Sequence, residues 1–273
     1  MREPITLFIV EGEKRDYRFA KEMERCFFVR GRHKITVISV PASQNVYMLY
    51  EQLREDDFDT DVVEILRERV PDARAKLEGV SRHSIDQIYL FFDFDPHQDN
   101  LTENGVASLD AIDTMLQVFD NETEHGKLFI SYPMVEALYD YRRDCCQAFS
   151  GCFIPIDDVP DYKRMAGDGN DNASEHMEHN QWKEVIEVFA LRVKCLLGLS
   201  SMSYELYRKK VTPLVLFQAQ RKVYELRERV FVLSAFPEFL LDYFKRDFWN
   251  SHVKRTRYSF ERCEKEEMGG AGN

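Results

Sequence analysis

Apolar residues form short continuous runs in the first half of the chain, and the segments between these runs carry apolar residues at helical spacing. Three runs, Ile5–Val10, Gln87–Phe92 and Lys127–Ile130, are typical of strands buried on both faces of a sheet. A further strand is expected at Ile35–Val40, where Pro41 ends the run. These four segments predict the strands of a central sheet.

Helices are predicted between these strands. Apolar residues recur at intervals of three and four in Tyr17–Val29, Gln44–Arg54, Asp61–Arg69 and Val106–Phe119. Pro71 is expected to stop the third of these helices. The alternation of strand and helix predicts an α/β fold with a mostly parallel sheet that is flanked by helices on both faces.

The second half of the chain has a different pattern. The segment Asp157–Asn180 is polar and contains Pro160 and two glycines, so it is expected to be a loop or insertion. Helices are then predicted at Gln181–Leu197, Met202–Lys210, Pro213–Arg229 and Pro237–Phe248, while Phe231–Ala235 fits either a short strand or a helix continuation. We therefore expect a catalytic core at 1–150, a polar loop or insertion at 151–180, a mainly helical region at 181–260 and a frayed tail at 261–273.

Composition indicates a soluble cytoplasmic protein. Hydrophobic residues make up 44% of the 273 residues, which is enough to bury a core. No apolar stretch reaches the roughly 20 residues needed to span a bilayer, and the first residues lack the layout of a signal peptide. The six cysteines, which include the adjacent Cys145 and Cys146, show no CxxC spacing, so reduced thiols are expected.

The formal net charge of −11 argues against broad, nonspecific affinity for nucleic acid. It does not exclude a nuclease, because metal ions neutralise part of an acidic site and basic patches can be local. Four such patches are Lys14–Arg18, Arg30–Lys34, Arg208–Lys210 and Lys254–Arg257. Each of them alone is more often a solvated face than a binding site.

Acidic residues follow the three buried runs. Glu11 follows the first run, Asp93 and Asp95 follow the second, and Glu136 comes shortly after the third. Because the carboxyl ends of parallel strands meet at one edge of a sheet, we expect these carboxylates to lie close together. Carboxylates at such distances repel one another unless a cation lies between them, and hard oxygen ligands suit Mg²⁺ or Mn²⁺. The pattern predicts a divalent-metal site.

Each of these acidic residues also has an ordinary structural interpretation. Glu11 fits a surface turn, and Asp16 fits the stabilisation of a helix N-terminus. Ser131 and Glu136 fit a simple helix start around Pro133. The combination of the three segments favours the functional interpretation over these alternatives.

Histidines and phosphate-binding loops add little. His176 and His179 are spaced to share a helix face, but no cysteine accompanies them, and an exposed loop position is the favoured interpretation of His97. No GxxxxGK[ST] motif occurs, so the chain is not expected to hydrolyse ATP by itself.

The order of the acidic segments resembles the Toprim domain of topoisomerases, bacterial primases and OLD-type nucleases. The family carries a glutamate after its first strand and a DxD after a later one, which Glu11 and Asp93–Asp95 match. The segments Glu11–Asp16 and Ser131–Glu136 look closest to the EGEKTE and SNPxFE patterns of RloB-like standalone Toprim proteins. The resemblance covers about residues 5–140, and it departs from the family pattern at Arg15, Asp16 and Tyr132.

The resemblance implies a Toprim-like core and a Mg²⁺-dependent phosphodiester hydrolase of the kind found in antiphage defence, acting on DNA or RNA. It also implies that any ATPase would be a separate partner protein, and it leaves self-association open. A non-cleaving regulatory subunit that binds metal or nucleotide is the alternative. A small phosphotransferase or phosphatase is a third possibility, which the same carboxylates can serve.

The roles expected from this resemblance are as follows. Asp93 and Asp95 share a metal ion, with Glu11 as a further ligand or as the base that receives the proton of the attacking water. A second metal would be held by residues among Asp16, Ser131 and Glu136. The scissile phosphate would be contacted by Lys14 or Arg15.

Overall fold

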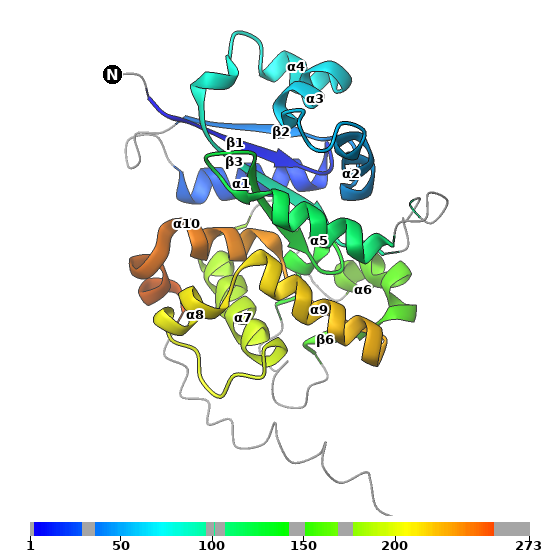
Figure 1. Ribbon diagram of the computed structural model, residues 1–273. Coiled ribbons are helices and arrows are strands. Elements are labelled where there is room, and N and C mark those ends of the chain that lie inside the picture. Colours follow the sequence, from blue (N-terminus) through cyan, green and yellow to red (C-terminus); the bar gives the residue numbers. More distant parts are fainter. Residues whose placement is uncertain are drawn as a thin grey trace, which may run out of the picture.

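The computed structural model describes residues 3–28, 36–96, 101, 107–141, 151–168 and 177–253 (Figure 1). Several predictions concern residues outside these ranges and are not tested by it. They concern His97, His176, Cys145 and Cys146, the basic patches Arg30–Lys34 and Lys254–Arg257, and the tail 261–273.

The central sheet has five strands in the order β2-β1-β3-β5-β4. These strands are β1 (Ile5–Val10), β2 (Thr36–Pro41), β3 (Ile85–Asp93), β4 (Asp120–Asn121) and β5 (Gly126–Ser131). The first three pairings are parallel, and only the two-residue β4 runs antiparallel to its neighbour. The four predicted strands are confirmed, while β4 was not predicted. Since β1, β3 and β5 are adjacent, their carboxyl ends meet at one edge of the sheet.

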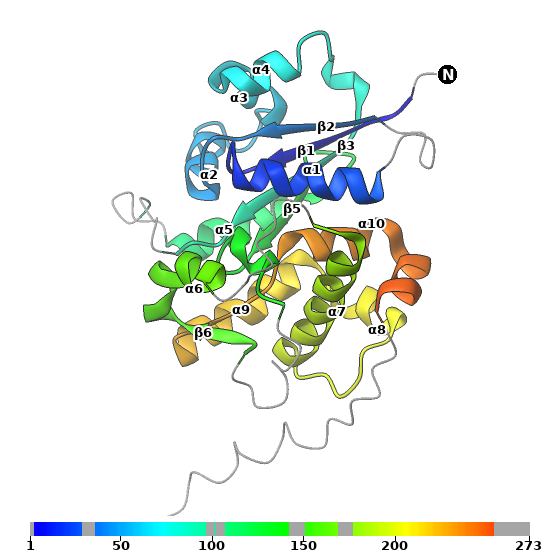
Figure 2. The same cartoon turned by 180° about the vertical axis from the view of Figure 1, so that it is seen from behind.

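Helices cover both faces of this sheet, as predicted. Helices α1 (Arg15–Phe27) and α10 (Ala235–His252) lie on one face, whereas α2 (Val46–Arg54) and α5 (Ser108–Val118) lie on the other (Figures 1 and 2). The short helices α3 (Val62–Arg69) and α4 (Pro71–Lys76) follow α2. Pro71 does end α3, but it also occupies the first turn of α4, a helix that was not predicted.

Side-chain caps explain where two of these helices begin. The Asn45 side chain accepts a hydrogen bond from the Met48 backbone N–H at 2.9 Å, and the Asp61 side chain accepts one from the Val63 N–H at 2.8 Å. Both residues are N-caps with extended backbone, so the helices start one residue later, at Val46 and Val62. These starts differ by only one or two residues from the predicted ones.

Aromatic rings join the sheet to the C-terminal helix. Phe239 of α10 packs against Phe8 of β1 at a ring-centroid distance of 5.2 Å, and Phe236 stacks on Phe91 of β3 at 5.0 Å. Most buried apolar residues of the predicted core and of the predicted helical region therefore belong to one hydrophobic cluster. Edge-to-face and stacked pairs of this kind add to the stabilisation that burial provides.

The remaining elements pack below the sheet in Figure 1. They are the strand pair β6 (Phe153–Pro155) and β7 (Arg229–Phe231), the 3₁₀ helix η4 (Ile156–Asp161), and the helices α6 (Tyr162–Asp168), α7 (His179–Leu196), α8 (Tyr204–Lys210) and α9 (Pro213–Arg227). The prediction of a loop over 157–168 is wrong, because this stretch forms η4 and α6. Helix α9 ends earlier than expected because Glu228 has a φ of 50° and begins the turn into β7.

None of the helices in the described ranges combines the length and apolar character needed to cross a membrane.

Candidate functional site

Glu11 lies directly after β1 and bridges to β3. Its backbone N–H donates a hydrogen bond to the carbonyl oxygen of Phe91 at 3.0 Å, so the chain continues along its neighbour beyond the end of the strand. The Glu11 carboxylate accepts a hydrogen bond from the backbone N–H of Asp93 at 3.0 Å. The first two predicted acidic motifs are therefore in direct contact.

Asp93 is the last residue of β3 and is paired in register with Ser131 of β5. Its carboxyl group has a pKa raised well above its usual value, first by burial and then by the negative charges of Glu11 and Asp16. A hydrogen bond from the Val135 backbone opposes this shift. The end of β3 thus holds a carboxyl group that the protein environment disfavours in its charged form.

Asp16 enters the same cluster from the first turn of α1. A Cβ atom at Gly12 would lie 2.6 Å from the Asp16 Oδ2 atom, so glycine is what permits this close approach. The pKa of Asp16 is raised to about 6, mainly by burial and also by the charge of Glu136. Hydrogen bonding to its own backbone and the nearby Arg15 and Lys163 oppose the shift.

The charge of Asp95 reaches Glu11 as well. Burial raises the pKa of Glu11 to about 8, against the hydrogen bond from Asp93, and the charges of Asp16 and Asp95 raise it further. The Asp95 backbone N–H donates to the carbonyl oxygen of Pro133 at 3.0 Å, which ties this residue to the segment after β5. Four predicted carboxylates from two segments, the one after β1 and the one at the end of β3, therefore interact at one edge of the sheet.

Glu136 is brought near the cluster, but it already has cationic partners. It lies in the 3₁₀ helix η3 (Val135–Leu138), where it is buried and forms an ion pair with Arg15. The Nζ atom of Lys163, on α6, lies 4.0 Å from the same carboxylate oxygen. The Glu136 carboxylate is thus engaged with Arg15, and its role as a metal ligand stays a prediction.

Ser131 is not joined to the acidic cluster by its hydroxyl group. The side chain is buried, and its Oγ atom accepts a hydrogen bond from the Ala235 backbone N–H, at the start of α10, at 3.3 Å. The following residue, Tyr132, exchanges two backbone hydrogen bonds with Leu233. Ser131 and Tyr132 therefore connect the end of β5 to the C-terminal region by hydrogen bonds.

The two predicted phosphate contacts differ. Arg15 is engaged with Glu136, whereas Lys14 is exposed and forms no ion pair with any described residue. Lys14 precedes α1 as its N-terminal flanking residue, on the same turn as the acidic cluster. Of the two, Lys14 is the side chain available to a substrate.

The donor chemistry of the cluster fits a hard divalent cation, although the side chains do not converge on one point. Within the described ranges, no set of three or more His, Cys, Asp or Glu side chains is arranged to hold a metal ion. The cluster nevertheless offers only carboxylate oxygens, the ligands that Mg²⁺ and Mn²⁺ prefer. The charges that act on Glu11 and Asp93 are negative, and a bound cation would lower the pKa values of both groups.

Sequence reasoning missed Lys163 and the backbone of Val135 as parts of this site. Lys163 lies in a segment that was predicted to be a loop, and only its position on α6 places it beside Glu136. The histidine pair is not tested, because His176 lies outside the described ranges; the ring of His179 packs 5.6 Å from that of Phe27 and 5.4 Å from that of His252. Pro160 and Asp161, directly before Tyr162, were the signal for a helix start there.

Comparison of this chain with protein-family models, with curated proteins and with solved structures found no match. The function of the acidic cluster is therefore inferred from its own chemistry.

Proposed function

We propose that this protein is a metal-dependent phosphodiester hydrolase that cleaves DNA or RNA at the carboxyl edge of β1 and β3. The observation that carries the proposal is the group of interacting carboxylates, Glu11, Asp16, Asp93 and Asp95, in which burial and mutual repulsion raise the pKa of three members. An arrangement of this kind destabilises the folded protein unless a cation binds there. Such a cost is typical of a functional site.

Glu11, Asp93 and Asp95 would hold a Mg²⁺ or Mn²⁺ ion, with Asp16 beside them. A divalent ion at such a site supplies a more acidic water molecule and stabilises negative charge on phosphate oxygens. When it is not a ligand, Glu11 would accept the proton of the attacking water. Exposed Lys14 would contact the phosphate of the substrate.

Arg15 and Glu136 receive a different role from the one expected at first. Their ion pair joins the first turn of α1 to η3 and thereby fixes the distance between two of the acidic segments. We therefore assign them to positioning, with Lys163 as a second cation beside Glu136. Ser131 has a similar role, because its hydroxyl group accepts a hydrogen bond from the start of α10.

The resemblance to Toprim proteins remains a prediction from the sequence motifs, as do a role in antiphage defence, a cytoplasmic location and a separate ATPase partner. A parallel sheet with acidic strand ends is compatible with that resemblance. Folds of this general class also carry many unrelated activities, so the site and not the fold supports the proposal.

A non-cleaving metal-binding or nucleotide-binding subunit is the second candidate. The formal net charge of −11 favours it, because such a charge argues against broad affinity for nucleic acid. In that case the cluster would bind a cation or a nucleotide and change the shape of the edge without hydrolysis.

The test is a cleavage assay with the purified full chain on plasmid DNA, single-stranded DNA and total tRNA, in Mg²⁺, Mn²⁺ or EDTA. Asp93→Asn is the test variant. Asp120→Asn is the matched control, because Asp120 is exposed on β4, at the other end of β5. We expect metal-dependent cleavage by the wild type and the control, and none by Asp93→Asn.

Two outcomes would reject the hydrolase. Cleavage that persists in EDTA, or equally in Asp93→Asn, would exclude the proposed site as its source. Absence of cleavage on all three substrates, together with saturable Mn²⁺ binding that Asp93→Asn loses, would establish the non-cleaving alternative.

A further inference from the structure

Helix α1 carries a cation that has no role in the proposed hydrolase site. This residue, Arg18, lies one helical turn after Lys14, because its backbone N–H donates to the Lys14 carbonyl oxygen at 3.0 Å. The Arg18 guanidinium donates to the hydroxyl group of Tyr139, directly after η3, at 2.9 Å. This partner is uncharged, and Arg18 forms no ion pair with any described residue. A guanidinium group has several N–H donors, so the contact with Tyr139 fixes its position and leaves donors for a ligand.

Lys163 brings a cation to the same side of the molecule from α6. Its Nζ atom lies 4.0 Å from the Glu136 carboxylate, which already pairs with Arg15, and its charge opposes the rise in the pKa of Asp16. The Lys163 side chain is 67% exposed, so its ammonium group is accessible from solvent. Figure 2 shows the start of α1 and helix α6 on the same side of the molecule. The fold therefore gathers cations from two distant segments beside the acidic edge.

The cations around η3 outnumber the carboxylates that pair with them. Arg15, Arg18 and Lys163 contact this 3₁₀ helix or the residue after it, and within the described ranges Glu136 is the one carboxylate that forms ion pairs with them. The excess is local, since the whole chain has a formal net charge of −11. Such a patch attracts a polyanion to one place on an otherwise acidic protein.

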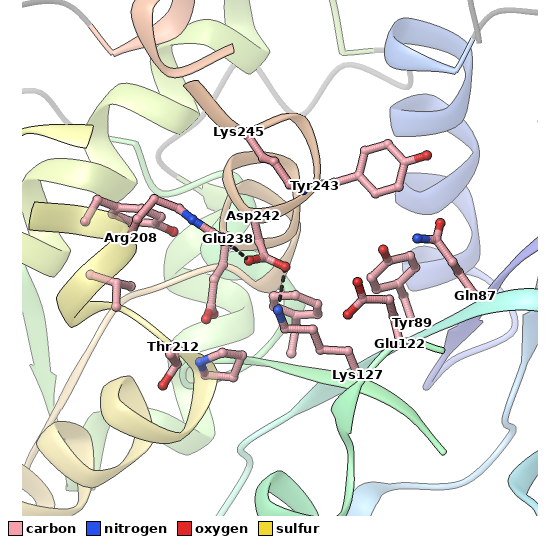
Figure 3. A pocket seen from close by; sticks show the side chains of 14 residues that line it. Gln87, Tyr89, Glu122, Lys127, Arg208, Thr212, Glu238, Asp242, Tyr243 and Lys245 are labelled. Atoms are coloured by element: carbon pink, nitrogen blue, oxygen red, sulfur yellow. Dashed lines mark hydrogen bonds and ion pairs between the residues drawn. The ribbon is translucent and has the colours of Figure 1, made fainter. Parts of the chain in front are cut away.

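A second group of cations does not offer the same excess. It lines a cavity of about 490 Å³ around Glu238, between the first halves of β3 and β5 and the helices α8 to α10 (Figure 3). Two of these cations, Lys127 and Arg208, donate to the same Asp242 carboxylate at 2.6 Å and 3.0 Å. Their charge is partly offset, and the cavity lies at the opposite end of the strands from the acidic edge. Arg18 and Lys163 are therefore the better placed cations for a substrate of that edge.

We propose that Arg18 and Lys163 bind phosphates of the substrate strand next to the scissile one, so that the substrate is a polynucleotide and not a small phosphate ester. This inference rests on the proposed function, because it names the substrate class of the acidic edge. A strand that leaves the edge along α1 meets Lys14 at the scissile phosphate and Arg18 one helical turn, about 5.4 Å, farther on. Guanidinium and ammonium groups form charge-assisted hydrogen bonds with phosphate oxygens. Such contacts position a strand without reading its bases.

The experiment measures the binding of fluorescein-labelled oligo(dT) and oligo(U), each of about 12 nucleotides, by fluorescence anisotropy. The protein is the full chain with Asp93→Asn, which is not expected to cleave, in EDTA. All variants are made in this parent, so the repulsion from the acidic edge is the same in each. Adding Arg18→Gln or Lys163→Gln is expected to weaken binding about fivefold in about 0.1 M salt and to reduce the slope of log K against log salt concentration by about 0.7. The two substitutions together should weaken binding about 25-fold.

Three controls separate phosphate binding from folding. Lys163 is exposed, so its variant tests a contact without disturbing packing. Arg18→Lys keeps the charge and should therefore retain the salt slope of the parent while losing part of the affinity. Lys222→Gln is the matched control, because Lys222 is exposed on α9, which packs on α5 and not on η3. It should bind both oligonucleotides as the parent does, and the melting temperature of each variant is compared with that of the parent.

The outcomes distinguish this inference from the hydrolase itself. Absence of oligonucleotide binding by the parent, or Arg18 and Lys163 variants that bind and respond to salt as Lys222→Gln does, would overturn it. Thymidylate that binds as tightly as oligo(dT) would also overturn it, because one phosphate would then suffice. Metal-dependent cleavage by the wild type, together with unchanged binding in these variants, would reject only the flanking phosphate contacts. Weakened binding in the variants without cleavage by the wild type would support the contacts and reject only the hydrolase.

Discussion

Two groups of buried charge lie close together in this molecule, and they are treated in opposite ways. In the first, the buried Arg192 guanidinium donates to Asp140 at 3.1 Å, to the carbonyl oxygen of Gly151 at 3.0 Å and to that of Val232 at 3.2 Å. The hydroxyl group of Tyr162 donates to the other Asp140 oxygen at 3.3 Å. In the second group, Glu11 and Asp93 repel each other without a cation between them.

The contrast indicates what each group is for. The Arg192 group joins α7, η3 and the β6–β7 pair, and its charges have partners, as expected for a structural link. At the acidic edge, the charges that act on Glu11 and Asp93 are those of neighbouring carboxylates, whereas Arg15 and Lys163 act on Asp16 and Glu136. Asp140 has Arg192 as its cation, whereas no cation of the described residues is paired with Glu11 or Asp93. We therefore expect a ligand to provide the positive charge beside Glu11 and Asp93.

The largest change in stability is expected when the ion pair between Arg192 and Asp140 is broken. Arg192→Met should lower the free energy of unfolding by about 3–5 kcal/mol, because it removes the buried guanidinium that pairs with Asp140. Urea denaturation measures this change. The double variant Asp140→Leu/Arg192→Met should recover much of the loss, and a loss below about 1 kcal/mol in the single variant would remove the contrast drawn above.

Removing a carboxylate from the acidic edge should instead raise the free energy of unfolding. Glu11→Gln is expected to raise the free energy of unfolding by about 2 kcal/mol in EDTA at pH 8, because it removes a buried carboxylate whose ionisation is disfavoured. Mg²⁺ should raise the melting temperature of the wild type and leave that of Glu11→Gln nearly unchanged. An equal response of both proteins to Mg²⁺ would place the cation elsewhere.

The difference in stability between Glu11→Gln and the wild type should depend on pH. The pKa of Glu11 rises from 4.5 in the unfolded chain to about 8 in the fold, so the folded state holds the proton more tightly. Its contribution is therefore present at low pH and is lost as the pH rises from about 4.5 through 8. In EDTA, the stability advantage of Glu11→Gln over the wild type should grow between pH 5 and pH 8.5, as chemical denaturation would show. An advantage that stays constant over this range would mean that Glu11 titrates normally.

The smallest effect is expected at Glu238. This carboxyl group has a cation nearby, Lys127, but Lys127 donates its hydrogen bond to Asp242. Glu238 is therefore less well paired than Asp140 and less strongly repelled than Glu11. Glu238→Leu should raise the free energy of unfolding by about 1 kcal/mol, since it replaces an unsatisfied carboxyl oxygen with apolar atoms of similar volume. Thermal unfolding at neutral pH measures the shift, with Glu228→Leu, at an exposed position, as the control for the substitution itself. A destabilised Glu238→Leu would show that the carboxyl group has a structural partner.

The strand ends could be predicted from the sequence because apolar runs mark buried strands. The break after Val10 and the break after Phe92 therefore placed Glu11 and Asp93 at the same edge, and the structure brings them into contact. The short elements β4 and β6 could not be predicted, because each is defined by a partner strand and not by its own pattern.

The interaction partners of individual side chains also could not be predicted from the sequence. Arg15 and Glu136 are 121 residues apart, and only the adjacency of β3 and β5 with the start of α1 brings them together. The cavity around Glu238 required α8, α9 and α10 to be placed against β5. Helical spacing indicates which residues of a helix are apolar, but it does not indicate which neighbour they face.

The packing of Phe236 and Phe239 on the sheet has a consequence for anyone who wishes to shorten this protein. The acidic edge is encoded by the first 140 residues, which invites the design of a truncated catalytic fragment. Such a fragment would expose the aromatic face formed by Phe8, Phe91 and Phe129 and would leave Tyr132 without its backbone pairing to Leu233. A deletion series would therefore report aggregation well before it reported on the acidic edge, and point substitutions are the appropriate tool for dissecting this protein.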